Sequence, residues 1–244
     1  MKNGNSSPIF VVGCGHSGTT FLARLLGVHS RIGIIPFETN FAEIWPEPCE
    51  NARKFFAQCD KFASCSGKPR WLEKTPTQIF YIDSILKHFP HGKVLLIIRD
   101  GRDVVYSIME RHGSLDGGIE RWMKGNLAGE AFWKHPNVHV IRYEDLVTDL
   151  EKTLRRILDF LGEEFEEHIL RYHEQPVYFF SSRLEKPPGL TGEQHPQYRN
   201  WQINQPLFDG RGRWLRLTEE QKERVKARMG DMLIRYGYTT DLNW

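Results

Sequence analysis

Residues 9–26 read Ile-Phe-Val-Val-Gly-Cys-Gly-His-Ser-Gly-Thr-Thr-Phe-Leu-Ala-Arg-Leu-Leu. The apolar run at 9–12 is typical of a buried strand, and the leucine spacing in 19–26 is typical of a helix with one apolar face. A strand, a Gly-rich turn and a helix in this order place backbone N–H groups and the positive end of the helix dipole around an anion. The sequence therefore predicts an anion-binding loop at 13–20, and the alternative is a tight turn that holds no ligand.

The loop fits two known nucleotide-binding patterns only in part. Gly13 and Gly18 have the spacing of the phosphate loop GxxxxGKS, but Thr19 stands where the lysine that reaches the β- and γ-phosphates should be. The apolar run at 94–98 is followed by Arg99 rather than by a carboxylate for magnesium. A dinucleotide fingerprint also fits the glycines, but no acidic residue ends a clean second strand. Phosphate binding is thus expected, whereas phosphoryl transfer from ATP is poorly supported.

Strand-like and helix-like segments alternate along the rest of the chain. The expected strands are 32–35, 71–75, 93–98 and 138–142. The expected helices are 39–45, 52–59, 76–89, 100–111, 119–133, 150–161 and, after a capping box that begins at Thr218, 218–236. This alternation predicts an α/β fold with a central parallel sheet flanked by helices. A chain of 244 residues fits one such domain over 1–244.

Two stretches break the pattern. Residues 46–70 are polar and poorly periodic, and residues 175–212 are rich in Pro, Gly, Asn and Gln. Long irregular segments in a compact domain are either functional or disordered. Aromatic residues in the second stretch favour a packed segment that covers a ligand. We expect both stretches to be insertions that shape the site of a second substrate.

Composition excludes several classes of protein. The 33 Lys and Arg residues nearly balance 31 Asp and Glu, so bulk charge gives no drive toward nucleic acid. No run approaches the length of a membrane span, and residues 1–8 lack the apolar region of a signal peptide, so the chain reads as cytoplasmic. The four cysteines have neither zinc-site nor disulfide spacing and are expected to be free thiols.

A second anion motif follows the strand at 93–98. Arg99 stands at the end of that strand, and Ser107 lies two turns into the helix that follows. The two side chains can converge on a second anion. The alternative for Arg99 is a salt bridge to Asp100, to Asp103 or to a neighbouring helix.

Taken together, these motifs resemble those of the sulfotransferases that use 3′-phosphoadenosine 5′-phosphosulfate (PAPS). Residues 13–20 look like the loop that holds the 5′-phosphosulfate, and 99–107 look like the motif for the 3′-phosphate. Glu73-Lys-Thr-Pro76 is similar to the family's lysine-bearing segment. Segments 142–146 and 210–214 resemble later parts of the family, so the likeness runs from about residue 8 to 236.

The resemblance implies a three-layer, P-loop-like fold and an enzyme that moves a sulfuryl group from PAPS to an acceptor hydroxyl or amine, leaving 3′-phosphoadenosine 5′-phosphate (PAP). It also implies that no metal takes part, so side chains and backbone N–H groups handle the charge. The likeness is greater to the tyrosylprotein, carbohydrate and bacterial branches than to the cytosolic branch that acts on small phenols.

The resemblance also assigns residues to the nucleotide. Loop groups would cradle the 5′-phosphosulfate, Arg99, Ser107 and Arg111 would hold the 3′-phosphate, and Arg213 would close over the nucleotide with Arg211 as its competitor. The full set is Cys14, Gly15, His16, Ser17, Gly18, Thr19, Thr20, Arg99, Ser107, Arg111, Tyr143, Arg211 and Arg213.

Two cations are assigned to the leaving phosphate. Lys74 would neutralise the bridging oxygen as it leaves. His16 departs from the family, which usually has Lys or Arg before Ser-Gly-Thr-Thr, and nearby phosphates would favour its charged form. The alternative is that His16 only fills the turn while Lys74 supplies the cation.

A carboxylate is the expected general base. The small-phenol branch has a His two residues after the lysine, but Pro76 stands there in this chain. The other branches use a Glu after the first helix, which matches Glu38, followed as candidates by Glu43 and Glu73. The alternative for Glu38 is a carboxylate that only stabilises a helix N-terminus.

Two other functions stay open at this point. One is a P-loop kinase or other phosphoryl transferase that uses ATP, and the other is a catalytically inactive nucleotide-binding module. The acceptor of a sulfotransferase would be a small molecule, a glycan, a lipid or a peptide, with no nucleic acid and no membrane span, and a homodimer is compatible with the sequence.

Overall fold

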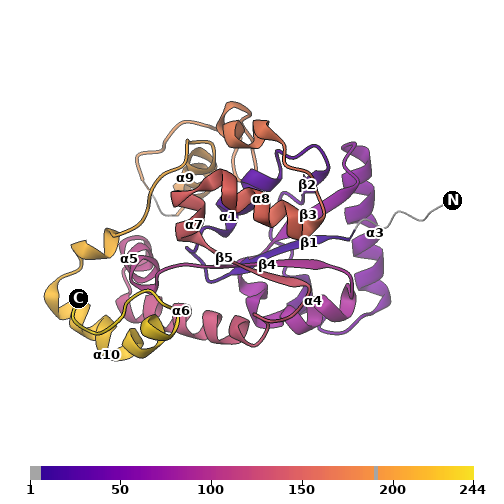
Figure 1. The fold of residues 1–244 in the computed structure, drawn as a ribbon. Helices are drawn as coiled ribbons and strands as arrows, with labels where there is room; N and C mark the ends of the chain where they lie inside the picture. The colour runs from indigo at the N-terminus through magenta and orange to yellow at the C-terminus, as the bar shows by residue number, and fades with distance from the viewer. Residues whose placement is uncertain (1–6, 190–191) are drawn as a thin grey trace.

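A computed structural model describes residues 7–189 and 192–244 and shows a five-stranded, all-parallel sheet (Figure 1). The strands are β1 (Ile9–Gly13), β2 (Ile32–Ile34), β3 (Arg70–Lys74), β4 (Lys93–Ile98) and β5 (Val138–Arg142). Their order is β2-β3-β1-β4-β5. The chain leaves β1 toward one edge and later fills the other, so the carboxyl end of β1 lies at a switch point, where α/β folds bind ligands. The predicted α/β sheet is confirmed.

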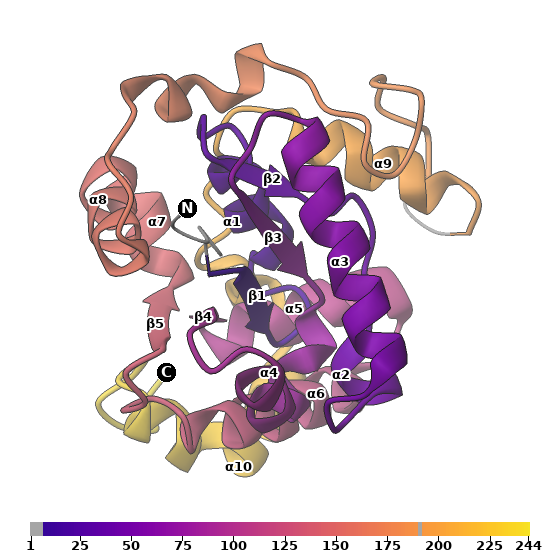
Figure 2. The same cartoon turned by 90° about the vertical axis from the view of Figure 1, so that its right-hand side faces the viewer.

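Alternate residues of the central strands bury on opposite faces of the sheet. Ile9 and Val11 join one core with α1 (Thr19–Leu26), α7 (Tyr143–Thr148) and α8 (Leu150–Leu161). Phe10 and Val12 join the core on the other face. That second core is covered by α2 (Phe41–Ile44), α3 (Glu50–Cys65), η1 (Pro76–Tyr81) and α4 (Ile82–His88). Figure 2 shows the sheet between α7 and α8 on one side and α3 on the other, which gives the three layers.

Three further helices form a third core beside the sheet. They are α5 (Gly101–His112), α6 (Leu115–Glu130) and α10 (Glu219–Arg235). The predicted capping box is present at the start of α10, where Thr218 and Gln221 bond each other's backbone. This core fixes α5 and α6 next to the carboxyl ends of β1 and β4.

The expectation that 46–70 is mostly irregular is wrong, although the helix expected at 52–59 is present and longer than predicted. Residues 50–65 form the 16-residue helix α3, whose N-terminus is capped by the Cys49 thiol. Its buried stripe of Ala52, Phe56, Cys59 and Ala63 has helical spacing. Three of these four side chains are small or weakly apolar, so the stripe gives little signal in the sequence.

The expectation for 175–212 is only partly right. The segment begins without regular structure after η2 (Glu167–Glu174), but it contains α9 (Gln194–Ile203), and η3 (Arg213–Arg216) follows it. α9 lies against α1 at the carboxyl side of the sheet (Figure 1). The segment therefore packs over the region where the anion loop is expected.

Two smaller points complete the fold. All four cysteines are free thiols, as expected. Across residues 7–189 and 192–244, none of the helices has both the length and the apolar character that a membrane crossing requires.

Candidate active site

A cavity of about 510 Å³ opens at the carboxyl ends of β1 and β4. The loop after β1 forms one wall, and α5 and α6 form another. Residues 195–213 close it from the side of α9. Most predicted site residues line this cavity: Cys14, Gly15, His16, Gly18, Thr19, Thr20, Glu38, Arg99, Ser107, Arg111, Tyr143 and Arg213.

The loop after β1 has the backbone geometry of an anion cradle. Gly18 takes a left-handed conformation with φ 97°, and a Cβ there would lie 2.8 Å from the Tyr143 ring. No described side chain caps α1, so its first backbone N–H groups are left for a ligand. Within the described residues, the hydroxyl of the fully buried Ser17 also lacks a hydrogen-bond partner. A buried polar group without a partner is costly, and a bound anion would satisfy it.

Arg99 joins the loop to the far wall of the cavity. Its guanidinium donates to the carbonyl of His16 at 3.0 Å and to that of Gly210 at 2.5 Å, and it lies 4.2 Å from the centre of the Tyr143 ring. Among the described residues Arg99 forms no salt bridge to Asp100, to Asp103 or to a neighbouring helix, so that alternative is wrong. Those carboxylates instead bond other groups: Asp100 pairs with Arg102, and Asp103 accepts from the backbone N–H groups of Gly212 and Trp214.

His16 connects the two anion motifs. It has φ 70°, and its Nδ1 lies 2.9 Å from Oγ of Ser107. Burial, as the largest cause, and the nearby Arg111, His112, Arg121 and Arg99 together lower the pKa of His16 to about 3. The imidazole is therefore neutral in the protein without a ligand. The charged form expected from the sequence needs an added anion.

Glu38 and Lys74 form an ion pair beside the cavity. Lys74 is buried at the end of β3, with a side chain 7% exposed, and Glu38 is 35% exposed. Burial acts to raise the pKa of Glu38, but Lys74 and Arg199 together bring it below its ordinary value. Burial lowers the pKa of Lys74, and Glu38 opposes that effect. Glu38 is thus ionised at neutral pH, as a base requires.

The other two base candidates lie in different surroundings. Glu43 is exposed on α2 and does not line the cavity. Glu73 is fully buried and accepts bonds from Thr39, Thr75 and Gln78. Burial raises the pKa of Glu73 to about 7, against the effect of these donors. Its contacts tie the segment that follows Glu38 to the end of β3.

Three predicted residues do not line the cavity: Ser17, Lys74 and Arg211. Ser17 belongs to the loop, but its side chain is fully buried. Lys74 forms an ion pair with Glu38, which lines the cavity. Arg211 turns to Asp209 and Thr148 on the surface, whereas Arg213 lines the cavity and pairs with Glu110 at 2.6 Å. Between the two competitors, the geometry favours Arg213. The Cys14 thiol is buried with its pKa raised to about 12, so it brings no charge.

The sequence analysis missed two arginines of the cavity. Arg121 lies on α6, near Gly15, and Arg199 lies on α9, where it contacts Glu38 and Thr20. In the sequence, Arg121 stands in an expected helix and Arg199 in the irregular stretch 175–212, and neither position by itself indicates a binding residue. With them, five arginines line the cavity, namely Arg99, Arg111, Arg121, Arg199 and Arg213, against the two acids Glu38 and Glu110. The cavity is therefore suited to a polyanion.

The chain is similar to known proteins. The model of the sulfotransferase family matches residues 38–167, which is 130 of the 244 residues. Protein-tyrosine sulfotransferase A of Caenorhabditis elegans is 28% identical over 208 residues, which cover 72% of this chain and 54% of that protein. The chain spans a smaller share, 27%, of a related uncharacterised protein of Aquifex aeolicus.

Two solved structures share the fold. The sulfotransferase domain of the olefin synthase of Synechococcus PCC 7002 has a TM-score of 0.57 and 16% identity, covering 94% of this chain and 98% of that one. A mouse sulfotransferase crystallised with PAP has a TM-score of 0.54 and 18% identity, covering 96% and 89%. The match to the family model, on a chain whose cavity collects the expected motifs, shows that this chain belongs to the sulfotransferase family.

Proposed function

We propose that this protein transfers the sulfuryl group of PAPS to an acceptor hydroxyl or amine, with Glu38 as the general base. One observation carries the proposal: the anion loop, the Arg99–Ser107 motif and Glu38 all open on a single cavity. The described residues surround one sheet, and we propose that they act as one sulfotransferase domain.

The residues of the cavity fit a nucleotide with two anionic ends. Backbone N–H groups of 15–20 would hold the 5′ end, and the unpaired Ser17 hydroxyl is buried in the same loop. Arg99, Ser107 and Arg111 would hold the 3′-phosphate. PAPS, when bound, supplies an activated sulfuryl group. The mouse relative that was crystallised with PAP supports this choice of nucleotide.

Glu38 is placed to remove the acceptor's proton. Its carboxylate is ionised, lines the cavity and keeps part of its surface free. A positioned base contributes on the order of 10²- to 10⁴-fold to the rate of a transfer step. Lys74 is proposed to offset the negative charge that develops on the leaving phosphate, from its place in the ion pair with Glu38 beside the cavity.

His16 is proposed to stabilise the leaving phosphate with Lys74. It sits at the turn of the loop, and its ring faces Ser107 and His112. In its neutral form the imidazole still carries one N–H donor. An anion bound next to the ring would raise the pKa of His16 and favour the imidazolium.

The acceptor is proposed to enter beside Glu38. Residues 195–213 line the cavity, which supports a role for the stretch 175–212, whereas residues 46–70 do not line it. The name of the nematode relative makes a peptide tyrosine the first acceptor to test. Small phenols, glycans and lipid alcohols complete the screen.

Two experiments test the proposal. The first measures transfer of labelled sulfate from PAPS to an acceptor library by the wild type, Glu38→Ala and Lys74→Ala. We expect turnover by the wild type and a loss on the order of 10²-fold or more in Glu38→Ala. Full activity of that variant would remove Glu38 as the base.

The second experiment is calorimetry with PAP and with ATP, each with EDTA or with magnesium. The proposal predicts binding of PAP that EDTA does not weaken. Magnesium-dependent binding of ATP and none of PAP would favour a phosphoryl transferase instead. Binding of PAP without transfer to any acceptor would favour an inactive nucleotide-binding module.

A further inference from the structure

Arg199 brings a second cation to the Glu38 carboxylate. Its Nη2 lies 3.4 Å from Oε1 of Glu38 and 3.3 Å from Oγ1 of Thr20. Lys74 contacts the same Oε1 from β3. One carboxylate oxygen is thus held between cations from two elements that are far apart in the sequence, and the guanidinium also touches the anion loop.

Side-chain amides hold α9 to the segment before it. Asn200 is fully buried and donates to the carbonyl of Arg183 at 2.8 Å. Asn204, one turn later, donates to the carbonyl of Val177 and accepts from its N–H, both at 2.8 Å. We call residues 177–183 together with α9 the strap. These bonds hold α9, and with it Arg199, to residues 177–183. The position of the helix therefore has support besides the contacts of Arg199 with Glu38 and Thr20.

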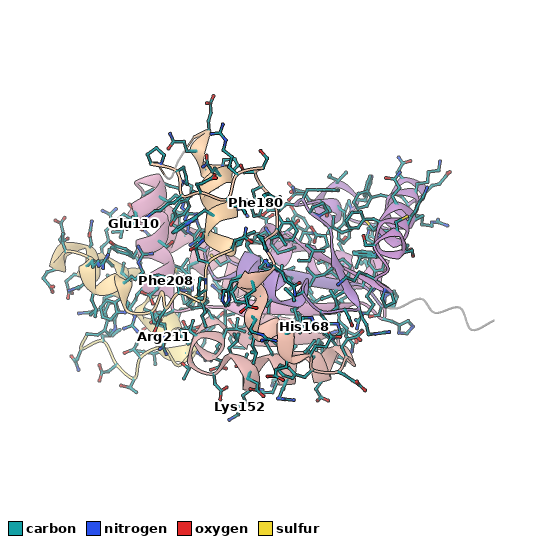
Figure 3. All side chains as sticks on the ribbon, turned by 90° about the horizontal axis from the view of Figure 1, so that it is seen from above. Glu110, Lys152, His168, Phe180, Phe208 and Arg211 are labelled. Carbon is teal, nitrogen blue, oxygen red and sulfur yellow. The ribbon has the colours of Figure 1, made fainter. Side chains whose placement is uncertain are left out.

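The strap also carries the apolar cover of the ion pairs. The guanidinium of Arg199 lies 4.0 Å from the centre of the Phe180 ring, and the Lys74 ammonium lies 5.8 Å from the same centre. Phe180 is among the side chains labelled in Figure 3. Stacking on an aromatic face is a preferred contact of arginine, and it limits access of water to the charges. The Arg199 side chain is only 25% exposed. Salt therefore screens this pair less than it screens a surface pair.

We propose that Arg199 is a positioning residue of the transfer site, which holds the Glu38 carboxylate ionised and in place beside Thr20 and Lys74. The inference rests on the assignment of Glu38 as the base. It gives the strap a role in catalysis besides covering the cavity.

The charges that face Glu38 give the direction of the effect. Within the described residues they are Lys74 from β3 and Arg199 from α9, with Glu73 buried behind Lys74. Burial acts to raise the pKa of Glu38, and the two cations lower it. Loss of the Arg199 charge leaves Lys74 alone against burial. The pKa of Glu38 then rises toward its ordinary value or above it.

The direct test is an NMR titration of the side-chain carboxyl of Glu38 in the full chain labelled with carbon-13. The Glu38 resonance is identified by its absence in Glu38→Gln. We expect a higher pKa of Glu38 in Arg199→Gln than in the wild type, and a pKa near the wild-type value in Arg199→Lys. Arg183→Gln is the matched control, because that exposed side chain lies on the same strap and should leave Glu38 unchanged.

Asn200→Ala is the second variant, since it loosens the strap without touching the site. It should raise the pKa of Glu38 as Arg199→Gln does, and circular dichroism checks that both variants are folded. An unchanged pKa of Glu38 in a folded Arg199→Gln would overturn the proposal, and a higher pKa there supports it. If Arg199→Gln does not fold, the pKa of Glu38 in Asn200→Ala decides in the same way.

Kinetics supply the catalytic readout. With an acceptor in hand, Arg199→Gln should lower kcat on the order of 10- to 100-fold and move the acid limb of the pH profile to higher pH, while Arg199→Lys restores both. The NMR titration of Glu38 requires no catalytic turnover. It therefore tests the role of Arg199 even if no acceptor is found and the proposed function fails. An active wild type with an unmoved acid limb in Arg199→Gln would contradict the inference alone.

Discussion

Nδ1 of His16 and Oγ of Ser107 lie 2.9 Å apart, so the loop after β1 and helix α5 meet at a single hydrogen bond. The bond joins the two motifs that hold the two anionic ends in the proposed complex. Arg99, which directly follows β4, also donates a hydrogen bond to the backbone carbonyl of His16. Changes on one motif should therefore be felt at the other.

Ser107→Ala should weaken PAP binding while leaving the fold intact. The hydroxyl is a proposed ligand of the 3′-phosphate, and loss of a hydrogen bond to a charged group costs about 1.5–3 kcal/mol. We expect the Kd for PAP from calorimetry to rise about 10- to 100-fold. Ser182→Ala, on an exposed position, is the control and should bind PAP as the wild type does. Equal affinity in all three proteins would remove Ser107 from the nucleotide site.

His16 should make the protein less stable in acid. Its pKa falls from an ordinary 6.5 to about 3 on folding, so the unfolded chain binds more protons between these values. The stability that comes from His16 is present above pH 6.5 and is lost as the pH falls toward 3. His16→Asn keeps a residue that tolerates positive φ and removes the titration. Urea unfolding across this range should show a shallower loss in the variant, and parallel curves would contradict the account.

Substitution of Glu73 should mainly lower the free energy of unfolding, and substitution of Glu38 should mainly lower the rate of sulfuryl transfer. Glu73→Ala leaves buried donors on Thr39, Thr75 and Gln78 without their acceptor, which costs about 1–3 kcal/mol for each unsatisfied group. Glu38→Gln keeps an oxygen that can accept from the buried Lys74 ammonium, so we expect a smaller loss of stability than in Glu73→Ala together with loss of transfer. Denaturant unfolding beside a transfer assay measures both. A stable Glu73→Ala that has lost activity would make Glu73 a base candidate again.

Gly18→Ala should destabilise the anion loop. The residue has φ 97°, and a Cβ would sit 2.8 Å from the Tyr143 ring, which is itself held by Arg99. Gly113 has a similar φ of 73° but has nothing within 4 Å of an added Cβ, so Gly113→Ala tests backbone strain alone. We expect a cost of about 1–2 kcal/mol in the control and a larger one in Gly18→Ala, with weaker PAP binding only in the latter. Equal costs and equal affinities would show that Tyr143 moves freely.

The sequence predicted the part of the fold that local patterns encode. Apolar runs mark the strands at 9–12 and 93–98, and glycines mark the loop between the first strand and the helix from Thr19. Arg99 stands directly after the second run. The strap was not predicted, because α9 has no continuous apolar stripe. It is held by Asn200 and Asn204 through bonds to a separate segment, and such contacts leave no periodic signal.

The same distinction applies to the site. Glu38, Lys74 and the Arg99 motif were assigned by their resemblance to the family, and the structure brings them to one cavity or to its edge. Arg121 and Arg199 could not be assigned, because a lone arginine in a sequence does not show which surface it faces. The preference for Arg213 over Arg211 likewise needed the three-dimensional structure, since the two differ in whether they line the cavity and in their ion-pair partners.

The most direct test of the central claim is transfer of labelled sulfate from PAPS by the wild type and by Glu38→Ala, with PAP binding measured in both. The account predicts a labelled product from the wild type, a loss on the order of 10²-fold or more in the variant, and PAP affinity kept in both proteins. Equal transfer by the two proteins would contradict the role of Glu38. No binding of PAP by the wild type would contradict the nucleotide site itself.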